Sequence, residues 1–190
     1  MSQFPIPAPT DFKRLIPTYV QEARAMASTM FGPADERWTY RGHWSQPQQG
    51  PMMSPRFDER TFAIRLSDRA MSNWWACVHE IGHEALHSLA PVSLADDTHL
   101  EEGAACIMAV RYRHAVTGNL VSGPTTGVYA APYRLVSALV DADPGIIMRC
   151  RSDGRRFRDI SPADLRAEGA TLRDEELAFL CSPFHSQQIV

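Results

Sequence analysis

The sequence predicts an α+β fold that is mostly helical, with a small sheet in its N-terminal half. Several long segments place apolar side chains at spacings of three and four, which is typical of helices. The segment 60–67 instead alternates Phe62, Ile64 and Leu66 with other side chains, which indicates a half-buried strand. A chain of 190 residues can bury a real core. We therefore expect a single domain over 1–190.

The N-terminal part should supply one helix and the sheet. Three prolines in the first ten residues predict an extended lead-in over 1–10. A helix is expected within 11–30, starting near Pro17 because proline is tolerated only in a first turn. An aromatic-rich strand is expected at 37–44, and the composition of 45–55 indicates a loop.

The middle of the chain should be helical. One long helix is expected from Ser67 or Asp68 to Leu89, with a capping side chain at its start. Two more helices are expected, at 98–116 and 129–142.

Two short helices should follow in the C-terminal part. Ser161 is expected to cap one of them and Thr171 the other. The arginine-rich stretch 149–158, in which aspartates interleave, is interpreted as a solvated turn.

Composition narrows the function. A net charge of -3 and a pI of about 6.1 provide no basic field for nucleic acid, so we expect no nucleic-acid partner. No apolar run is long enough to span a membrane, and the N-terminus does not resemble a Sec signal peptide. Four scattered cysteines without a C-x-x-C pair predict reduced thiols and a cytoplasmic protein.

The main chemical signal is His79-Glu80-Ile81-Gly82-His83, an H-E-x-x-H pattern inside the expected long helix. Histidines four residues apart project from one helix face one turn apart, which allows both to bind one zinc ion. Zinc lowers the pKa of a bound water, and Glu80 is positioned to accept its proton. The pattern also arises by chance, so a polar helix face facing water is the competing interpretation.

A catalytic zinc needs a third protein ligand and an open position. His87 lies about 12 Å along the helix from His79, so it is interpreted as an outer or surface residue. Asp96 and Asp97 could orient a ligand imidazole or cap the next helix. The remaining candidates for the third ligand lie next to His83 or near the start of the next helix: Glu84, His99, Glu101 and Glu102.

The eighteen residues between His83 and Glu102-Gly103 give the motif a family resemblance. The arrangement resembles gluzincin metallopeptidases, and in size the chain is similar to single-domain minigluzincins. The resemblance implies a zincin-like domain with His79, His83 and Glu102 as zinc ligands and Glu80 as catalytic base. It also implies a sheet whose edge strand grips an extended peptide or protein substrate. Segment 60–67 is the candidate for that strand.

Gluzincins also use a tyrosine or histidine to stabilise the oxyanion. The downstream candidates are Tyr129, Tyr133, His114 and His185. We favour Tyr133 as this catalytic residue because it follows a glycine-rich loop that could fold over a cleft.

Three functions remain open from the sequence. The first is a zinc metallopeptidase, and one form of it is a dedicated regulatory protease similar to those that cleave phage-type repressors. The second is a non-catalytic, zinc-stabilised binding or regulatory domain, in which a fourth protein ligand such as His99 would replace the open position. The third is a metal-dependent hydrolase or toxin that acts on a non-peptide bond.

Overall fold

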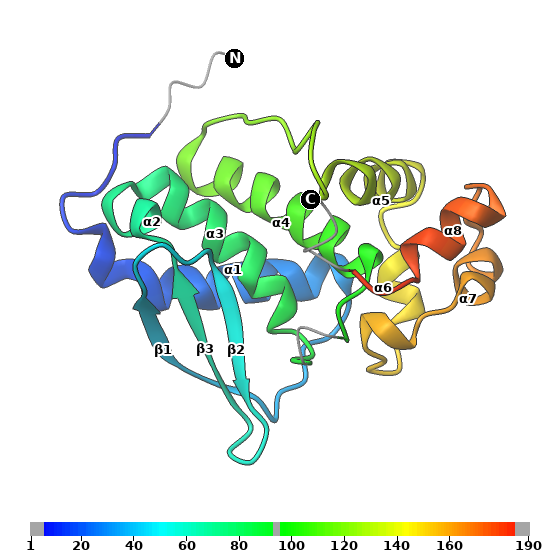
Figure 1. The fold of residues 1–190 in the computed structure, drawn as a ribbon, viewed down its shortest axis with the longest axis horizontal. Helices are drawn as coiled ribbons and strands as arrows, with labels where there is room; N and C mark the ends of the chain where they lie inside the picture. The colour runs from blue at the N-terminus through cyan, green and yellow to red at the C-terminus, as the bar shows by residue number, and fades with distance from the viewer. Residues whose placement is uncertain (1–5, 93–95, 185–190) are drawn as a thin grey trace.

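The computed structural model describes residues 6–92 and 96–184, and it has the expected α+β composition (Figure 1). A three-stranded sheet lies on one side of a group of helices, and the shorter C-terminal helices gather at the opposite end. Part of the expected lead-in, residues 1–5, lies outside the described residues.

Helix α1 (Ile16–Phe31) follows a short 3-10 turn at Phe12–Leu15. Pro17 lies in its first turn, where the missing N–H costs no hydrogen bond, so this expected start is confirmed. The helix ends at Gly32, whose φ of 102° is open to glycine but strained for other residues.

The sheet consists of β1 (Thr39–Ser45), β2 (Met52–Arg56) and β3 (Thr61–Leu66) in the order β1-β3-β2. Strand β3 pairs in parallel with β1 and antiparallel with β2. Two expectations are therefore corrected. Part of the expected 45–55 loop is strand β2, which gains its structure by pairing with β3. The segment 60–67 forms the central strand and not an edge.

The expected long helix is interrupted. Helix α2 (Asp68–Ser72) and helix α3 (Trp74–His87) are separated at Asn73, whose backbone is extended. The Ser67 hydroxyl accepts a hydrogen bond from the N–H of Ala70 and caps α2, while the Asn73 side chain accepts one from Ala76 and caps α3.

Helix α4 (His99–Thr117) has the expected position. The Thr98 hydroxyl caps it by accepting a hydrogen bond from the N–H of Glu101, and Gly118 ends it in a left-handed conformation. Helix α5 (Ala130–Ala142) is also confirmed.

The remaining elements are short. Ser161 caps α7 (Pro162–Ala167) as expected, but residue 173 and not Thr171 precedes α8 (Asp174–Leu180). Two further short elements precede them in the chain: α6 (Ile146–Cys150) and a 3-10 turn at Phe157–Asp159.

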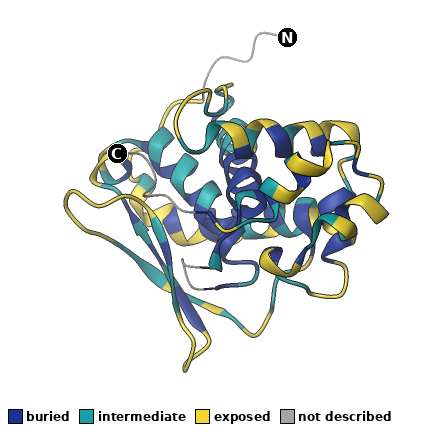
Figure 2. Ribbon diagram, turned by 45° about the vertical axis from the view of Figure 1, so that its right-hand side comes forward, coloured by how far each residue is buried: buried dark blue, intermediate teal, exposed yellow. Residues whose placement is uncertain are grey.

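The core surrounds α3, which packs against α1, α4 and the sheet. Figure 2 shows buried residues concentrated in the central helices and exposed ones along the outer helices and loops. A buried hydrogen-bond network ties three helices together: the indole of Trp74 donates to the Tyr19 hydroxyl, and the Tyr112 hydroxyl donates to the Tyr19 carbonyl. The helix with the H-E-x-x-H pattern is therefore held firmly from several sides.

Candidate metal centre

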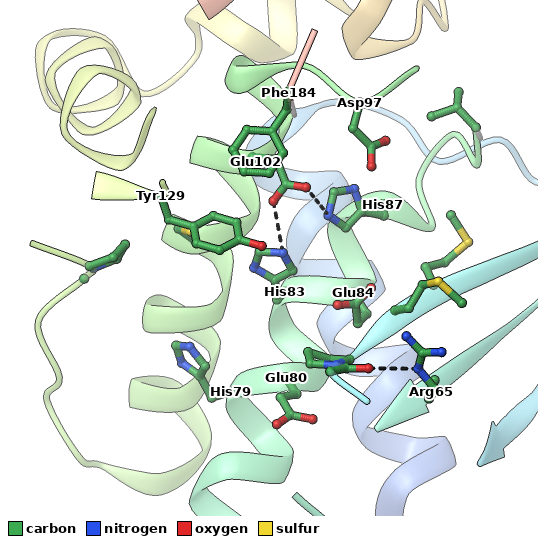
Figure 3. A pocket seen from close by; sticks show the side chains of 18 of the residues that line it. Arg65, His79, Glu80, His83, Glu84, His87, Asp97, Glu102, Tyr129 and Phe184 are labelled. Atoms are coloured by element: carbon green, nitrogen blue, oxygen red, sulfur yellow. Dashed lines mark hydrogen bonds and ion pairs between the residues drawn. The ribbon is translucent and has the colours of Figure 1, made fainter. Parts of the chain in front are cut away.

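A cavity of about 660 Å³ lies over α3, between α4, strand β2 and the loop before α5 (Figure 3). It contains most of the residues that the sequence singles out. Its polar wall includes His79, Glu80, His83, Glu84, His87 and Glu102.

His83 and Glu102 face each other across the α3–α4 contact. The His83 Nε2 lies 3.3 Å from the Glu102 Oε2, and both side chains are largely buried. Burial disfavours protonation of His83, but hydrogen bonds with Cys106 and Glu102 and the Glu102 charge raise its pKa well above the usual value. Burial works against ionisation of Glu102, yet the His83 hydrogen bond and the nearby histidines lower its pKa.

His87 is buried next to this pair, so the expectation of a surface position is wrong. Its Nδ1 lies 3.0 Å from the Glu101 Oε1, and its Nε2 lies 3.9 Å from the Glu102 Oε1. Burial opposes its protonation, but the Glu101 hydrogen bond and the surrounding carboxylates raise its pKa to about 10. Because α4 crosses the end of α3, its first turn covers a residue that the sequence could not distinguish from a surface one.

His79 is one turn earlier on α3 and also lines the cavity. Its Nδ1 is buried without a hydrogen-bond partner. Burial and then the proximity of His83 lower the pKa of His79 to about 4, which keeps this imidazole neutral.

The two glutamates that follow the histidines have different surroundings. Glu80 accepts hydrogen bonds from the Ser67 backbone N–H at 2.8 Å and from the Ser67 hydroxyl at 2.5 Å, so both of its carboxylate oxygens are engaged. Glu84 is buried in the cavity wall, and burial raises its pKa despite the opposing charges of His83 and His87.

The tyrosines considered as stabilisers of the oxyanion lie at different cavities of the structure. Tyr129 lines the cavity, and its ring stands edge-on to His83 with the centroids 6.1 Å apart. Tyr133 does not line this cavity: it borders a separate one on α5 and packs against Gly123. Tyr129 lies directly before α5 and Tyr133 about 6 Å further along the helix. The glycine-containing loop before α5 borders the cavity, but the tyrosine that lies in the cavity wall is Tyr129 and not Tyr133.

The other candidates also have assigned positions. His114 is not part of the cavity wall, and His185 lies outside the described residues. His99 packs on Phe179 with the ring centroids 4.1 Å apart.

The two aspartates before α4 have different roles. Asp96 forms an ion pair with Arg158 at 2.5 Å. Asp97 is buried in the cavity wall, where burial raises its pKa to about 7.

Metal-ligand geometry exists at two overlapping places in the described part of the chain. The ligand atoms of His83, His87 and Glu102 all lie within 4.8 Å of one another, as do those of His87, Asp97 and Glu101. Imidazole nitrogens and carboxylate oxygens are ligands that suit zinc. The buried Glu102 Oε2 adds to the fit: it meets the His83 Nε2 at 3.3 Å without the alignment of a good hydrogen bond, and a bound cation would satisfy both atoms. The donor set therefore fits one divalent metal ion.

Comparisons with known proteins leave the site to be interpreted on its own chemistry. No model of a protein family, no curated protein and no solved structure matches the chain. Within residues 6–92 and 96–184, no helix is both long enough and apolar enough to cross a bilayer.

Proposed function

We propose that the protein is a zinc-dependent metallopeptidase of the gluzincin type. The observation that carries the proposal is the buried contact between His83 on one helix and Glu102 on the next, inside a cavity that contains further histidines and glutamates of α3. Two helices that bring histidine and glutamate ligands together are what such a site requires.

The residues of the cavity have distinct tasks in this proposal. Zinc, when bound, would supply Lewis acidity to polarise a substrate carbonyl and acidify water. A glutamate of α3 accepts the proton of the attacking water and delivers it to the leaving amine. Tyr129 lines the cavity beside His83, whereas Tyr133 does not, and Tyr129 would stabilise the developing oxyanion.

Strand β2 is suited to hold the substrate. It lies at the edge of the sheet, and Met52 and Met53 contribute to the cavity wall. A peptide that pairs with this edge would extend the sheet. Such pairing uses main-chain hydrogen bonds, so it can hold peptides of many different sequences. The substrate-gripping role expected for segment 60–67 therefore moves to β2.

A catalytic site is favoured over a purely structural one by the position of His99. The ring of His99 packs on Phe179 and Phe184, and it belongs to neither of the two metal-ligand groups among the described residues. Within residues 6–92 and 96–184, His99 therefore supplies no fourth ligand at the position that a substrate needs.

The test is the zinc content of the purified full chain, measured by elemental mass spectrometry beside Glu102→Ala, together with hydrolysis of a peptide library. We expect about one zinc per chain in the wild type, its loss in the variant, and hydrolysis that a chelator abolishes. Zinc binding without any peptide hydrolysis would instead support the non-catalytic domain or, if esters or amides are cleaved, the hydrolase of another bond. Hydrolysis that survives full removal of metal would contradict the proposal.

A further inference from the structure

The segment from His79 to His87 contains the zinc motif twice. His79-Glu80-Ile81-Gly82-His83 is one H-E-x-x-H pattern, and His83-Glu84-Ala85-Leu86-His87 is a second one that shares His83. Both fall within α3, so each presents two histidines one turn apart on the same helix face. We call the pattern 79–83 the first register and the pattern 83–87 the second register. The helix alone does not decide which of the two binds the metal, because both have the same local geometry.

The distances to α4 distinguish the two registers. Ligand atoms around a tetrahedral zinc with bonds of about 2.0 Å lie roughly 3.3 Å apart. Glu102 approaches this spacing with the Nε2 atoms of His83 and His87, at 3.3 Å and 3.9 Å. His79 belongs to neither of the two metal-ligand groups found among residues 6–92 and 96–184. Figure 3 shows His83, His87 and Glu102 converging while His79, one turn earlier on α3, lies apart from them.

The hydrogen bonds around the histidines point to the same register. A metal-binding histidine usually donates its other ring nitrogen to a carboxylate, which fixes the direction of the ring. His87 has this arrangement, because its Nδ1 binds the buried Glu101 and its Nε2 is left facing Glu102. His79 lacks such a partner, since its Nδ1 is buried without a hydrogen bond.

The glutamates also differ in a way that favours the second register. Both oxygens of Glu80 are held by Ser67 at the start of α2, and in Figure 3 its carboxylate points away from the His83–Glu102 pair. Glu84 lies in the cavity wall between α3 and strand β2, which is the proposed substrate strand. A hydrogen bond from the Met53 backbone joins Glu84 to this strand, so Glu84 is the α3 glutamate that adjoins both the ligand histidines and β2.

We infer that the second register is the functional one: His83, His87 and Glu102 hold the metal, Glu84 is the general base, and Glu101 orients His87. Glu80 then serves as a positioning residue that fastens α3 to Ser67. This inference rests on the proposed function for the role of Glu84, whereas the ligand set stands on the geometry alone.

The ligand set is tested with cobalt and a matched pair of variants, His87→Cys and His79→Cys. A thiolate that binds Co²⁺ produces an intense near-ultraviolet charge-transfer band, which requires a folded site and therefore separates ligation from unfolding. The spectrum of the wild type gives the background absorbance, because Cys106 also lines the cavity and is itself a thiol. We expect the band in His87→Cys and only background in His79→Cys. The reverse pattern would overturn the inference and leave the proposed metallopeptidase intact.

Zinc affinity and hydrolysis complete the test. We expect His87→Ala to weaken zinc binding at least 100-fold and His79→Ala by less than about threefold. Glu84→Gln should lower peptide hydrolysis at least 100-fold with zinc retained, and Glu80→Gln at most about tenfold. A larger loss from Glu80→Gln than from Glu84→Gln would refute the assignment of the base. Cobalt and zinc binding that depends on His87 in a protein without peptide hydrolysis would refute the proposed function but retain the ligand set.

Discussion

Arg151 illustrates how a single residue can escape interpretation from sequence. It lies in the arginine-rich stretch 149–158, yet it is completely buried. Its guanidinium donates to the carbonyl oxygens of Phe31 at 2.8 Å, Arg155 at 3.0 Å and Pro33 at 3.3 Å, and it stacks on the ring of Phe157. The expected solvated turn is therefore wrong at this position: Arg151 satisfies the carbonyls at the end of α1.

Replacing Arg151 with methionine should destabilise the protein by roughly 3 kcal/mol. The change removes charge-assisted hydrogen bonds and leaves buried carbonyls without donors. Urea unfolding measures the effect. The matched control is Arg156→Met, which removes an exposed ion pair with Asp159 and should cost less than about 1 kcal/mol. Equal losses in the two variants would contradict the structural role of Arg151.

At the scale of elements, the approach of α4 to its neighbours depends on small residues. A Cβ at Gly82 would lie 3.0 Å from the Ala109 Cα, and one at Gly103 would lie 2.6 Å from the Pro132 carbonyl oxygen. These glycines let α4 pack closely on α3 and α5. The close packing brings the first turn of α4, with Glu101 and Glu102, to the histidines of α3.

Gly103→Ala should destabilise the protein by about 1–3 kcal/mol, although alanine is the better helix former. The added methyl meets backbone atoms of α5 that cannot rotate away, so the helices must separate. Zinc affinity should fall as well, because Glu102 is the preceding residue. Urea unfolding and zinc titration measure the two effects beside Gly50→Ala, where a Cβ meets nothing within 4 Å. A neutral Gly103→Ala would mean that α4 and α5 are less tightly packed than described.

The cap of α7 predicts a dependence of stability on pH. Hydrogen bonds from the Ser161 hydroxyl and N–H, followed by Arg155, lower the pKa of Asp164 to about 2. A carboxyl whose pKa is lowered by folding stabilises the protein at any pH above the pKa that it has in the unfolded chain, about 4. This contribution disappears as the pH falls through the folded pKa of about 2.

We therefore expect Asp164→Asn to be less stable than the wild type at pH 7, with the difference shrinking below about pH 4. Urea unfolding midpoints between pH 7 and pH 3 provide the measurement. Asp58→Asn, which removes a carboxylate at an exposed turn between β2 and β3, is measured in parallel as the control. A difference that stays constant over this range would exclude the Asp164 cap as its source.

At the scale of the whole molecule, the cavity concentrates buried charge. Glu84, Asp97, Glu101 and Glu102 are all buried around the histidines of α3. Burying several carboxylates is costly unless cations accompany them. A metal ion bound at this site should therefore stabilise the folded protein.

Zinc at about 1,000 times its dissociation constant should stabilise the native protein by about 4 kcal/mol. For a chain of this length, that corresponds to a rise in melting temperature of roughly 8–16 °C. Calorimetry with added zinc and after chelation measures the shift, and Glu102→Ala should show almost none. An equal shift in that variant would mean that zinc binds elsewhere.

Much of the architecture could be predicted from local signals. Apolar periodicity and terminal residues such as Thr98 and Gly118 locate α4, and alternation locates β3. Strand β2 could not be predicted, because a short segment with Pro55 becomes a strand only by pairing with β3. The sequence does not indicate the break at Asn73, because the segments on both sides of it favour a helix.

The sequence by itself determined the candidate ligand residues: histidines and glutamates at helical spacing on one segment, followed by Glu101 and Glu102 at the start of another helix. The reason is that periodicity and residue type are local properties of the chain. Only the tertiary structure decided which of them meet. The crossing of α4 over α3 buries His87 beside Glu102, and the loop before α5 brings Tyr129 to the cavity in place of Tyr133. Such contacts join residues far apart in the chain, so no local pattern contains them.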